Sequence, residues 1–221
     1  MNKYDLTEDI LVEVFGKGLN KDFIEESILV VNTYRLFFGL SKRIDMIRFL
    51  AQVKHEAIFV DTKEGRVPML EENLNFSDKR LFELSSYWRK HKKELKKVRK
   101  LGIEEQKRAI VDKWYKDGYD WVGHGCLMVT GKENTIKCLK LIEQVTQEKL
   151  LTDDKRPKQG IFKRFDIWWL LGMAYWRINH LYACNGSLEC TNRINNGLPT
   201  KDKHERVRTA VKLNSTLFIN V

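Results

Sequence analysis

The stretch Phe49-Leu-Ala-Gln-Val-Lys-His-Glu56 ends a segment in which apolar residues recur at three- and four-residue intervals from Ile44 onward. That spacing predicts a helix that packs one face into a core. Glu56 then falls in the last turn, where a carboxylate is poorly placed because the helix dipole is negative there. Two further carboxylates, Glu71 and Glu72, follow after a polar loop. Two carboxylates facing each other across a loop suit glycoside hydrolysis, although a solvated surface role is the plainer alternative.

The size and composition of the chain predict one folded domain over residues 1–221. The mass is 26.2 kDa, and 43% of the residues are hydrophobic, enough for a substantial core. The formal net charge is +10 and the sequence pI is about 9.4. A balance this basic favours a polyanionic partner, which could be nucleic acid, an anionic membrane surface or a bacterial cell wall. Charge alone does not choose among them.

Neither secretion nor membrane insertion is predicted by the sequence. The N-terminus lacks the apolar segment of a secretory signal, and the most apolar run, Ile167–Trp176, is too short to cross a bilayer. We therefore expect a soluble protein made in the cytoplasm. In that compartment the cysteines are expected to be free and mostly buried, although four could pair in three ways. The cysteines are Cys126, Cys138, Cys184 and Cys190.

Helix signals recur along the whole chain and predict an all-α fold with at most a minor β element. Thr7, Asn20 and Ser41 are expected N-caps of the first three helices. The segment 61–68 reads as a polar loop, and 118–131 as an extended glycine-rich segment that approaches another element or a ligand closely. Further helices are expected near residues 81–88, 104–115, 135–149, 162–181, 191–197 and 204–213.

The run RKHKKELKKVRK at residues 89–100 is the most basic part of the sequence. It could form a strip that contacts phosphate groups. A solvated helix face is the favoured interpretation, because Leu95 and Val98 recur at helical spacing and predict an inward face.

Four stretches in order resemble glycoside hydrolase family 19, in the branch of phage endolysins and lysozyme-like enzymes, with plant chitinases more distant. Residues 48–56 resemble a FLAQxxHE helix, and 70–77 resemble a LEENLNYS segment. Residues 123–134 are similar to GRGLIQLTGxxN. Residues 190–197, followed by Glu205-Arg206, are similar to a TxxINGG…(D/E)R tail. Together these stretches span most of the chain.

The resemblance implies a lysozyme-like fold in which two helical lobes flank a substrate cleft, and cleavage of β-1,4 bonds of amino sugars with inversion. Glu56 would be the general acid that protonates the glycosidic oxygen. Glu72 would be the general base that activates water on the opposite face of the sugar. Glu71 is the alternative base and otherwise a substrate-binding residue, and Asp61 or Glu64 could substitute for it because the intervening loop is long.

The resemblance also assigns residues around this pair. Thr130 matches the hydroxyl residue that helps to hold the water. Asn134, Asn195 and Arg206 match substrate-contacting or site-ordering positions, and His124 stands where the family has a substrate-binding Arg. No metal and no cofactor are needed for acid–base hydrolysis, and none is expected. His55 is interpreted as a structural hydrogen-bonding residue.

The sequence also departs from the family pattern at three places. Ala57-Ile58-Phe59 replaces Ser-Gly-Gly, His124 replaces Arg, and Met128 replaces a Gln whose amide could bond a sugar. These departures bear on substrate specificity, while the acid–base pair stays possible.

The leading hypothesis is a monomeric peptidoglycan hydrolase that cuts between MurNAc and GlcNAc. It would reach the bacterial cell wall in the periplasm after release by a phage lysis or secretion system. The anionic wall is the expected partner, without membrane insertion and without a specific nucleic acid. A chitinase is the alternative enzyme, and a catalytically inactive binder of cell wall or nucleic acid is the alternative outside the enzyme class.

Overall fold

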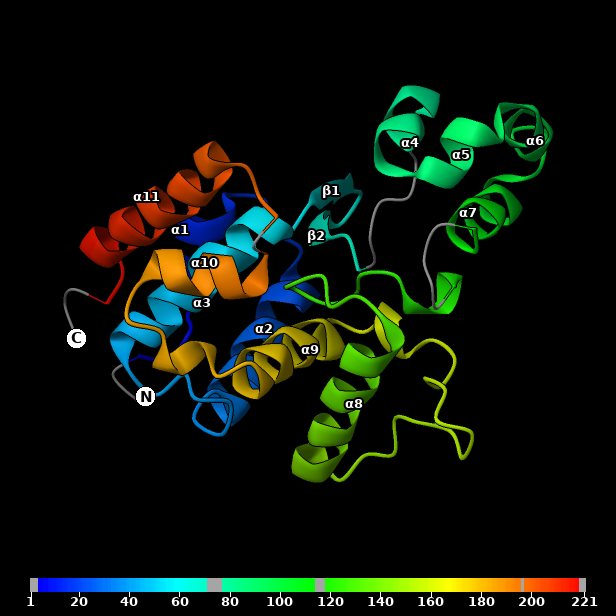
Figure 1. Cartoon of the computed structure of the whole chain (residues 1–221). Helices are drawn as coiled ribbons and strands as arrows, with labels where there is room; N and C mark the ends of the chain where they lie inside the picture. The colour runs from blue at the N-terminus through cyan, green and yellow to red at the C-terminus, as the bar shows by residue number, and fades with distance from the viewer. Residues whose placement is uncertain (1–3, 71–76, 114–117, 196, 219–221) are drawn as a thin grey trace.

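The computed structural model describes residues 4–70, 77–113, 118–195 and 197–218. The fold is mainly α-helical, as the helix signals predict, and the strands of the described chain form a single two-stranded hairpin (Figure 1). The helices of the main body are α1 (Glu8–Phe15), α2 (Lys21–Tyr34), α3 (Arg43–Glu56), α8 (Lys132–Thr146), α9 (Phe165–Ile178), α10 (Ser187–Ile194) and α11 (Thr200–Thr216). Short 3-10 turns occupy η1 (Tyr119–Trp121), η2 (Ile161–Lys163) and η3 (Leu181–Ala183).

The core of the main body is built around α9, which packs against α2 and α8. Trp168, Trp169 and Trp176 of this helix are buried, and each large apolar side chain removed from water contributes about 2–3 kcal/mol before the entropy cost of ordering it. Phe49 of α3 meets the ring of Trp176 edge to face, with 5.5 Å between centroids. The apolar residues of α3 from Met46 to Val53 therefore face the same core as α9, whereas Ile44, where the predicted apolar spacing begins, is 37% exposed.

The ends of α3 position the candidate acid. Its N-cap is Lys42, which makes no side-chain capping bond, so the expected cap at Ser41 is wrong by one residue. Thr7 and Asn20 do cap α1 and α2, as predicted, through bonds to the backbone N–H groups of Ile10 and Phe23. The helix ends at Glu56 because Ala57 takes an extended conformation with ψ of 121°.

A β-hairpin follows α3 where the sequence suggested a polar loop. Strand β1 (Phe59–Thr62) pairs antiparallel with β2 (Gly65–Pro68). The hairpin is held from outside, because Arg66 exchanges backbone hydrogen bonds with the loop before α2, accepting from Asn20 at 2.9 Å and donating to Gly18 at 2.7 Å. This long-range support has no local sequence signature, so the charged and turn-forming residues read as a loop.

The remaining helices form a separate lobe, defined here as residues 77–113 and called the basic lobe (Figure 1). It contains α4 (Asp78–Leu84), α5 (Ser86–Lys90), α6 (Lys92–Val98) and α7 (Ile103–Val111). Its own small core gathers around Trp88, whose indole N–H donates to the carbonyl of Ile110 at 3.1 Å. Leu95 and Val98 are buried in this core, as their helical spacing predicts, and residues 89–100 are divided at His91 between α5 and α6.

None of the helices in the described part of the chain combines the length and the apolar composition that crossing a bilayer requires.

Candidate active site

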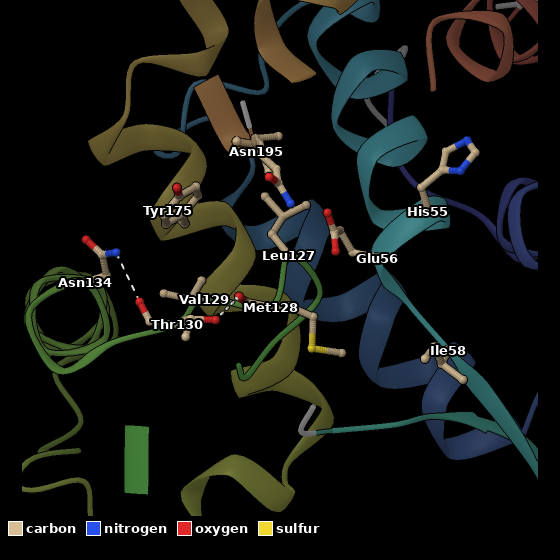
Figure 2. A pocket seen from close by; sticks show the side chains of 11 residues that line it. His55, Glu56, Ile58, Leu127, Met128, Val129, Thr130, Asn134, Tyr175 and Asn195 are labelled. Carbon is tan, nitrogen blue, oxygen red and sulfur yellow. Dashed lines mark hydrogen bonds between the residues drawn. The ribbon is translucent and has the colours of Figure 1, made fainter. Parts of the chain in front are cut away.

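A cavity of about 540 Å³ lies where the end of α3 meets the loop before α8 (Figure 2). Polar groups from α3, the loop before α8, α8, α9 and the end of α10 converge on it, which is typical of ligand sites. Its lining residues are His55, Glu56, Ile58, Leu127, Met128, Val129, Thr130, Asn134, Tyr175, Ile194 and Asn195.

Glu56 points into this cavity from the last turn of α3, and its side chain is 19% exposed (Figure 2). Oε1 of Glu56 lies 2.7 Å from Nη1 of Arg206, whose side chain is only 6% exposed. The guanidinium offsets both the carboxylate charge and the negative end of the helix dipole. A carboxylate at an unfavourable helix terminus is thus held by a buried cation from α11.

The ion pair continues into a buried chain of hydrogen bonds behind the cavity. Nη1 of Arg206 also donates to Oε1 of Gln52 at 3.1 Å, and Nε2 of Gln52 donates to Oγ1 of Thr191 at 2.9 Å. The Thr191 hydroxyl in turn donates to the carbonyl of Ser187 at 2.9 Å. Gln52 lies one helical turn before Glu56, so α3, α10 and α11 are locked together around the carboxylate.

The loop 123–131 forms the facing wall and is pressed tightly onto α9. A Cβ atom on Gly125 would lie 2.6 Å from Cβ of Leu171, and a Cβ atom on Gly172 would lie 2.0 Å from Sγ of Cys126. The sequence predicted that the glycines approach another element or a ligand closely. At Gly125 the element approached is α9. The expected extended segment is instead a turn closed by hydrogen bonds between His124 and Val129.

Thr130 and Asn134 are presented by the end of this loop and the first turn of α8. The Thr130 hydroxyl donates to the carbonyl of Met128 at 2.9 Å, and Nδ2 of Asn134 donates to the carbonyl of Thr130 at 3.1 Å (Figure 2). Met128 has a φ of 48°, a left-handed conformation that is uncommon for a residue with a side chain. Such strain is often found where a loop shapes a binding site.

His55 and Tyr175 are the other ionisable residues among those that line the cavity. The His55 ring points away from the cavity, and its Nε2 lies 2.7 Å from the hydroxyl of Thr209 (Figure 2). Burial, followed by the charge of Arg206, lowers the pKa of His55. Burial raises the pKa of Tyr175, with smaller contributions from Cys138 and Glu56. Tyr175 therefore keeps its proton and offers a hydroxyl donor on the cavity wall.

The structure brings together Glu56, Thr130, Asn134 and Asn195 around one cavity, with Arg206 directly behind Glu56. His124 is the exception. It is buried and stacked on Phe162 at a centroid distance of 3.8 Å, and it is absent from the cavity lining. The expectation of a direct substrate contact through this ring is corrected accordingly, because its stacking partner holds it in the interior.

The second carboxylate is the part of the site that the described residues do not supply. Glu71 and Glu72 lie outside the described residues. The possible substitutes lie on the hairpin and do not line the cavity: Asp61 is 92% exposed and 3.9 Å from Arg66, and Glu64 is exposed. Among the described lining residues, Glu56 is thus the only carboxylate.

Three participants were not anticipated from the sequence. Tyr175 lies in a helix that is apolar on nearly all sides, so no polar periodicity in the sequence distinguished its hydroxyl group. Gln52 and Thr191 lie within the motif stretches 48–56 and 190–197, but the sequence assigned them no role beyond forming the helices. The i, i+4 spacing of Gln52 and Glu56 was the available signal for a shared face.

Possible metal ligands and reactive thiols were sought among the described residues. There, no group of three or more His, Cys, Asp or Glu side chains is arranged to hold a metal ion. All four cysteines are free and buried. Burial raises the pKa of Cys138 to about 12 and that of Cys126 well above its usual value, so these thiols stay protonated and are poor nucleophiles.

The sequence matches no model of a known protein family, and no curated protein matches it either.

Proposed function

We propose that this protein is a glycoside hydrolase that cleaves the β-1,4 bond between MurNAc and GlcNAc of peptidoglycan by inverting general acid–base catalysis. The observation that carries the proposal is the ion pair of Glu56 with buried Arg206 at the edge of a 540 Å³ cavity. Hydroxyl and amide groups of Thr130, Asn134 and Asn195 line the same cavity. They suit the hydroxyl and N-acetyl groups of an amino sugar.

In this mechanism Glu56, which is paired with Arg206 as a carboxylate, first takes up a proton from solvent and then donates it to the glycosidic oxygen as the bond to the leaving sugar breaks. A base removes a proton from the water that attacks the anomeric carbon from the opposite face. After proton transfer, Arg206 stabilises the carboxylate left on Glu56. Thr130 and Tyr175 offer hydroxyl groups that can orient the sugar or the water.

We assign the base to Glu72, with Glu71 as the alternative. The position of the chain before them supports this assignment. Met69 donates its backbone N–H to the carbonyl of Ile58 at 2.7 Å, and Ile58 lines the cavity. The hairpin thus returns the chain to the cavity rim immediately before the two glutamates in sequence.

A catalytically inactive binder of cell wall or nucleic acid is the second candidate. One observation favours it: Glu56 is the only carboxylate among the described lining residues. In addition, Met128 cannot offer the amide of a glutamine to a sugar. A chitinase acting on GlcNAc polymers would use the same acid and is separated from the leading proposal by substrate alone.

Digestion of purified peptidoglycan tests the proposal, with new reducing ends identified by mass spectrometry. The unaltered protein should release reducing-end MurNAc, and Glu56→Gln should lower the rate by at least about 100-fold, because a general acid contributes that much. Glu72→Gln should be similarly impaired, and comparison with Glu71→Gln shows which of the two glutamates is the base. Reducing-end GlcNAc would retain the site and change the bond cleaved.

Release of nothing by any of these proteins would contradict hydrolysis of peptidoglycan. Chitin oligomers are the second substrate in the same assay, and cleavage of them alone would make the protein a chitinase. If neither substrate is cleaved while Glu56→Gln binds the wall like the unaltered protein, the binder stands in place of the enzyme.

A further inference from the structure

The basic lobe carries most of the excess positive charge of the protein. Residues 77–113 contain thirteen Lys and Arg against six Asp and Glu, a net +7 within a chain whose total is +10. The lobe also has its own core, so its charged residues are not needed to build the cavity. The proposed catalytic mechanism gives the charged residues of the lobe no role.

Four lysines of the lobe form one strip. Lys93, Lys96, Lys97 and Lys100 are exposed on α6 and the turn that follows it. Their spacing of three, four and seven residues places them on one side of a helix, over a length of about 10 Å. Leu95, on the other side, is buried in the lobe core, which fixes the strip toward solvent.

The acidic groups near this strip are engaged elsewhere. Glu94 accepts a hydrogen bond from the Tyr87 hydroxyl at 2.7 Å, and Asp78 pairs with Arg99 at 2.8 Å. Within the described chain, no carboxylate lies at ion-pair distance from the four lysines. Like charges at these spacings repel one another, and a bound polyanion offsets that repulsion.

The lobe is attached at the rim of the candidate active site. The backbone N–H of Tyr119 in η1 donates to Oδ1 of Asp112, just after α7, at 2.9 Å. Two residues further on, the carbonyl of Trp121 accepts from the N–H of Gly131 at 2.9 Å. Gly131 directly follows Thr130 of the cavity lining, so these hydrogen bonds connect the end of α7 to the loop that forms one wall of the cavity.

We propose that the strip of Lys93, Lys96, Lys97 and Lys100 is a docking surface for the carboxylates on the stem peptides of a peptidoglycan strand. The inference rests on the proposed function, because it takes the strand in the cavity as the polymer that reaches the lobe. Stem peptides place carboxylates at intervals along a neutral sugar backbone. The connection of the lobe to the cavity wall favours a polymer that also enters the cavity, and so favours this partner over nucleic acid.

A sedimentation assay with purified peptidoglycan, freed of other wall polymers, tests the docking surface. It is carried out in the Glu56→Gln background, so that the polymer stays intact. The test variant replaces the four strip lysines by glutamine. The matched control replaces Lys158, Lys163, Lys201 and Lys212, which are exposed outside the lobe, and so makes the same change in net charge. Circular dichroism verifies the fold of each protein.

The strip variant should bind about tenfold more weakly at low salt, and the control should bind nearly as the parent does. Rising salt should remove the difference, because exposed charges are screened. Amidation of the peptidoglycan carboxylates should remove it as well. Chitin, which has no carboxylates, should show no difference between the two variants.

Equal losses in the strip variant and the control would overturn the proposal in favour of net charge alone. Unchanged binding by the strip variant would overturn it outright. Tighter, strip-dependent binding to duplex DNA than to peptidoglycan would replace the partner by nucleic acid. Binding is measured here without hydrolysis, so the two proposals can fail separately. If the unaltered protein releases no reducing ends but binding still depends on the strip, the proposed function is wrong and the docking surface is retained.

Discussion

Arg206 joins the candidate acid to the protein interior. Its Nη1 group lies within hydrogen-bond distance of both Glu56 and Gln52, and its side chain is almost fully buried. Exposed ion pairs contribute little to stability, whereas removal of one partner from a buried pair leaves a charge without compensation. The residue therefore serves the fold and the site at once, and its truncation should affect both.

Arg206→Ala should lower the free energy of unfolding by about 2–3 kcal/mol, less than for a fully buried pair because Glu56 keeps partial contact with water. Urea denaturation measures the change. Arg208→Ala on the same helix is the control, because Arg208 is exposed, and it should change stability by less than about 0.5 kcal/mol. Equal losses in the two variants would show that Arg206 acts as an ordinary surface residue.

His55 should make stability depend on pH. Burial and Arg206 lower the pKa of its imidazole in the folded protein, so the unfolded chain binds the proton more readily. Stability contributed by the neutral ring is complete above the usual value of 6.5 and is lost as the pH falls below it. His55→Gln, which retains a partner for Thr209, should flatten urea stability between pH 7.5 and 5.5. His204→Gln, an exposed change on α11, should leave the slope as it is.

At the scale of elements, the contact between the loop 123–131 and α9 decides where Thr130 lies. The backbone N–H of Cys126 donates to the carbonyl of Trp168 at 2.9 Å, and its sulfur fills the space beside Gly172. In the interior of a helix, alanine normally gives a more stable protein than glycine, by about 0.5–1 kcal/mol. Here the added methyl group would meet sulfur, so the usual preference reverses.

Gly172→Ala should destabilise the protein by about 1–3 kcal/mol and, by shifting the loop, lower any rate of bond cleavage. Thermal unfolding measures the first effect. Gly186→Ala is the control, because a Cβ atom there meets nothing within 4 Å and φ is −170°. In a protein that already carries Cys126→Ala, adding Gly172→Ala should cost much less stability than it does in the unaltered protein, because the sulfur is gone. If the double variant is no better, the contact with Cys126 is not the cause.

The helices could be predicted from the sequence because their signals are local. Apolar spacing identified α3, and the side chains of Thr7 and Asn20 cap their helices as expected. The hairpin could not be found this way, since its stability comes from Arg66 bonding to the loop before α2. The turn at 123–131 was missed for the same reason: its shape depends on α9.

For the whole molecule, the resemblance of four stretches to a known family predicted which segments meet but not the depth of each side chain. Glu56, Thr130, Asn134 and Asn195 come from distant segments and line one cavity. His124 belongs to the same segment as Thr130 yet is turned into the core against Phe162. Which side of a short turn faces the cavity is a tertiary property, and the motif alone does not carry it.

The separate core of the basic lobe has a consequence for how the protein loses its structure. Trp88 and its neighbours share no buried cluster with α9, and the lobe packs against the rest of the described chain through a small cluster of Val111, Val122 and Tyr119. Cooperativity extends only as far as the contacts that must break together. Because the contacts between the lobe and the main body are few, we expect the lobe to open at a lower free energy than the main body, so that a single midpoint of denaturation would describe mainly the larger unit.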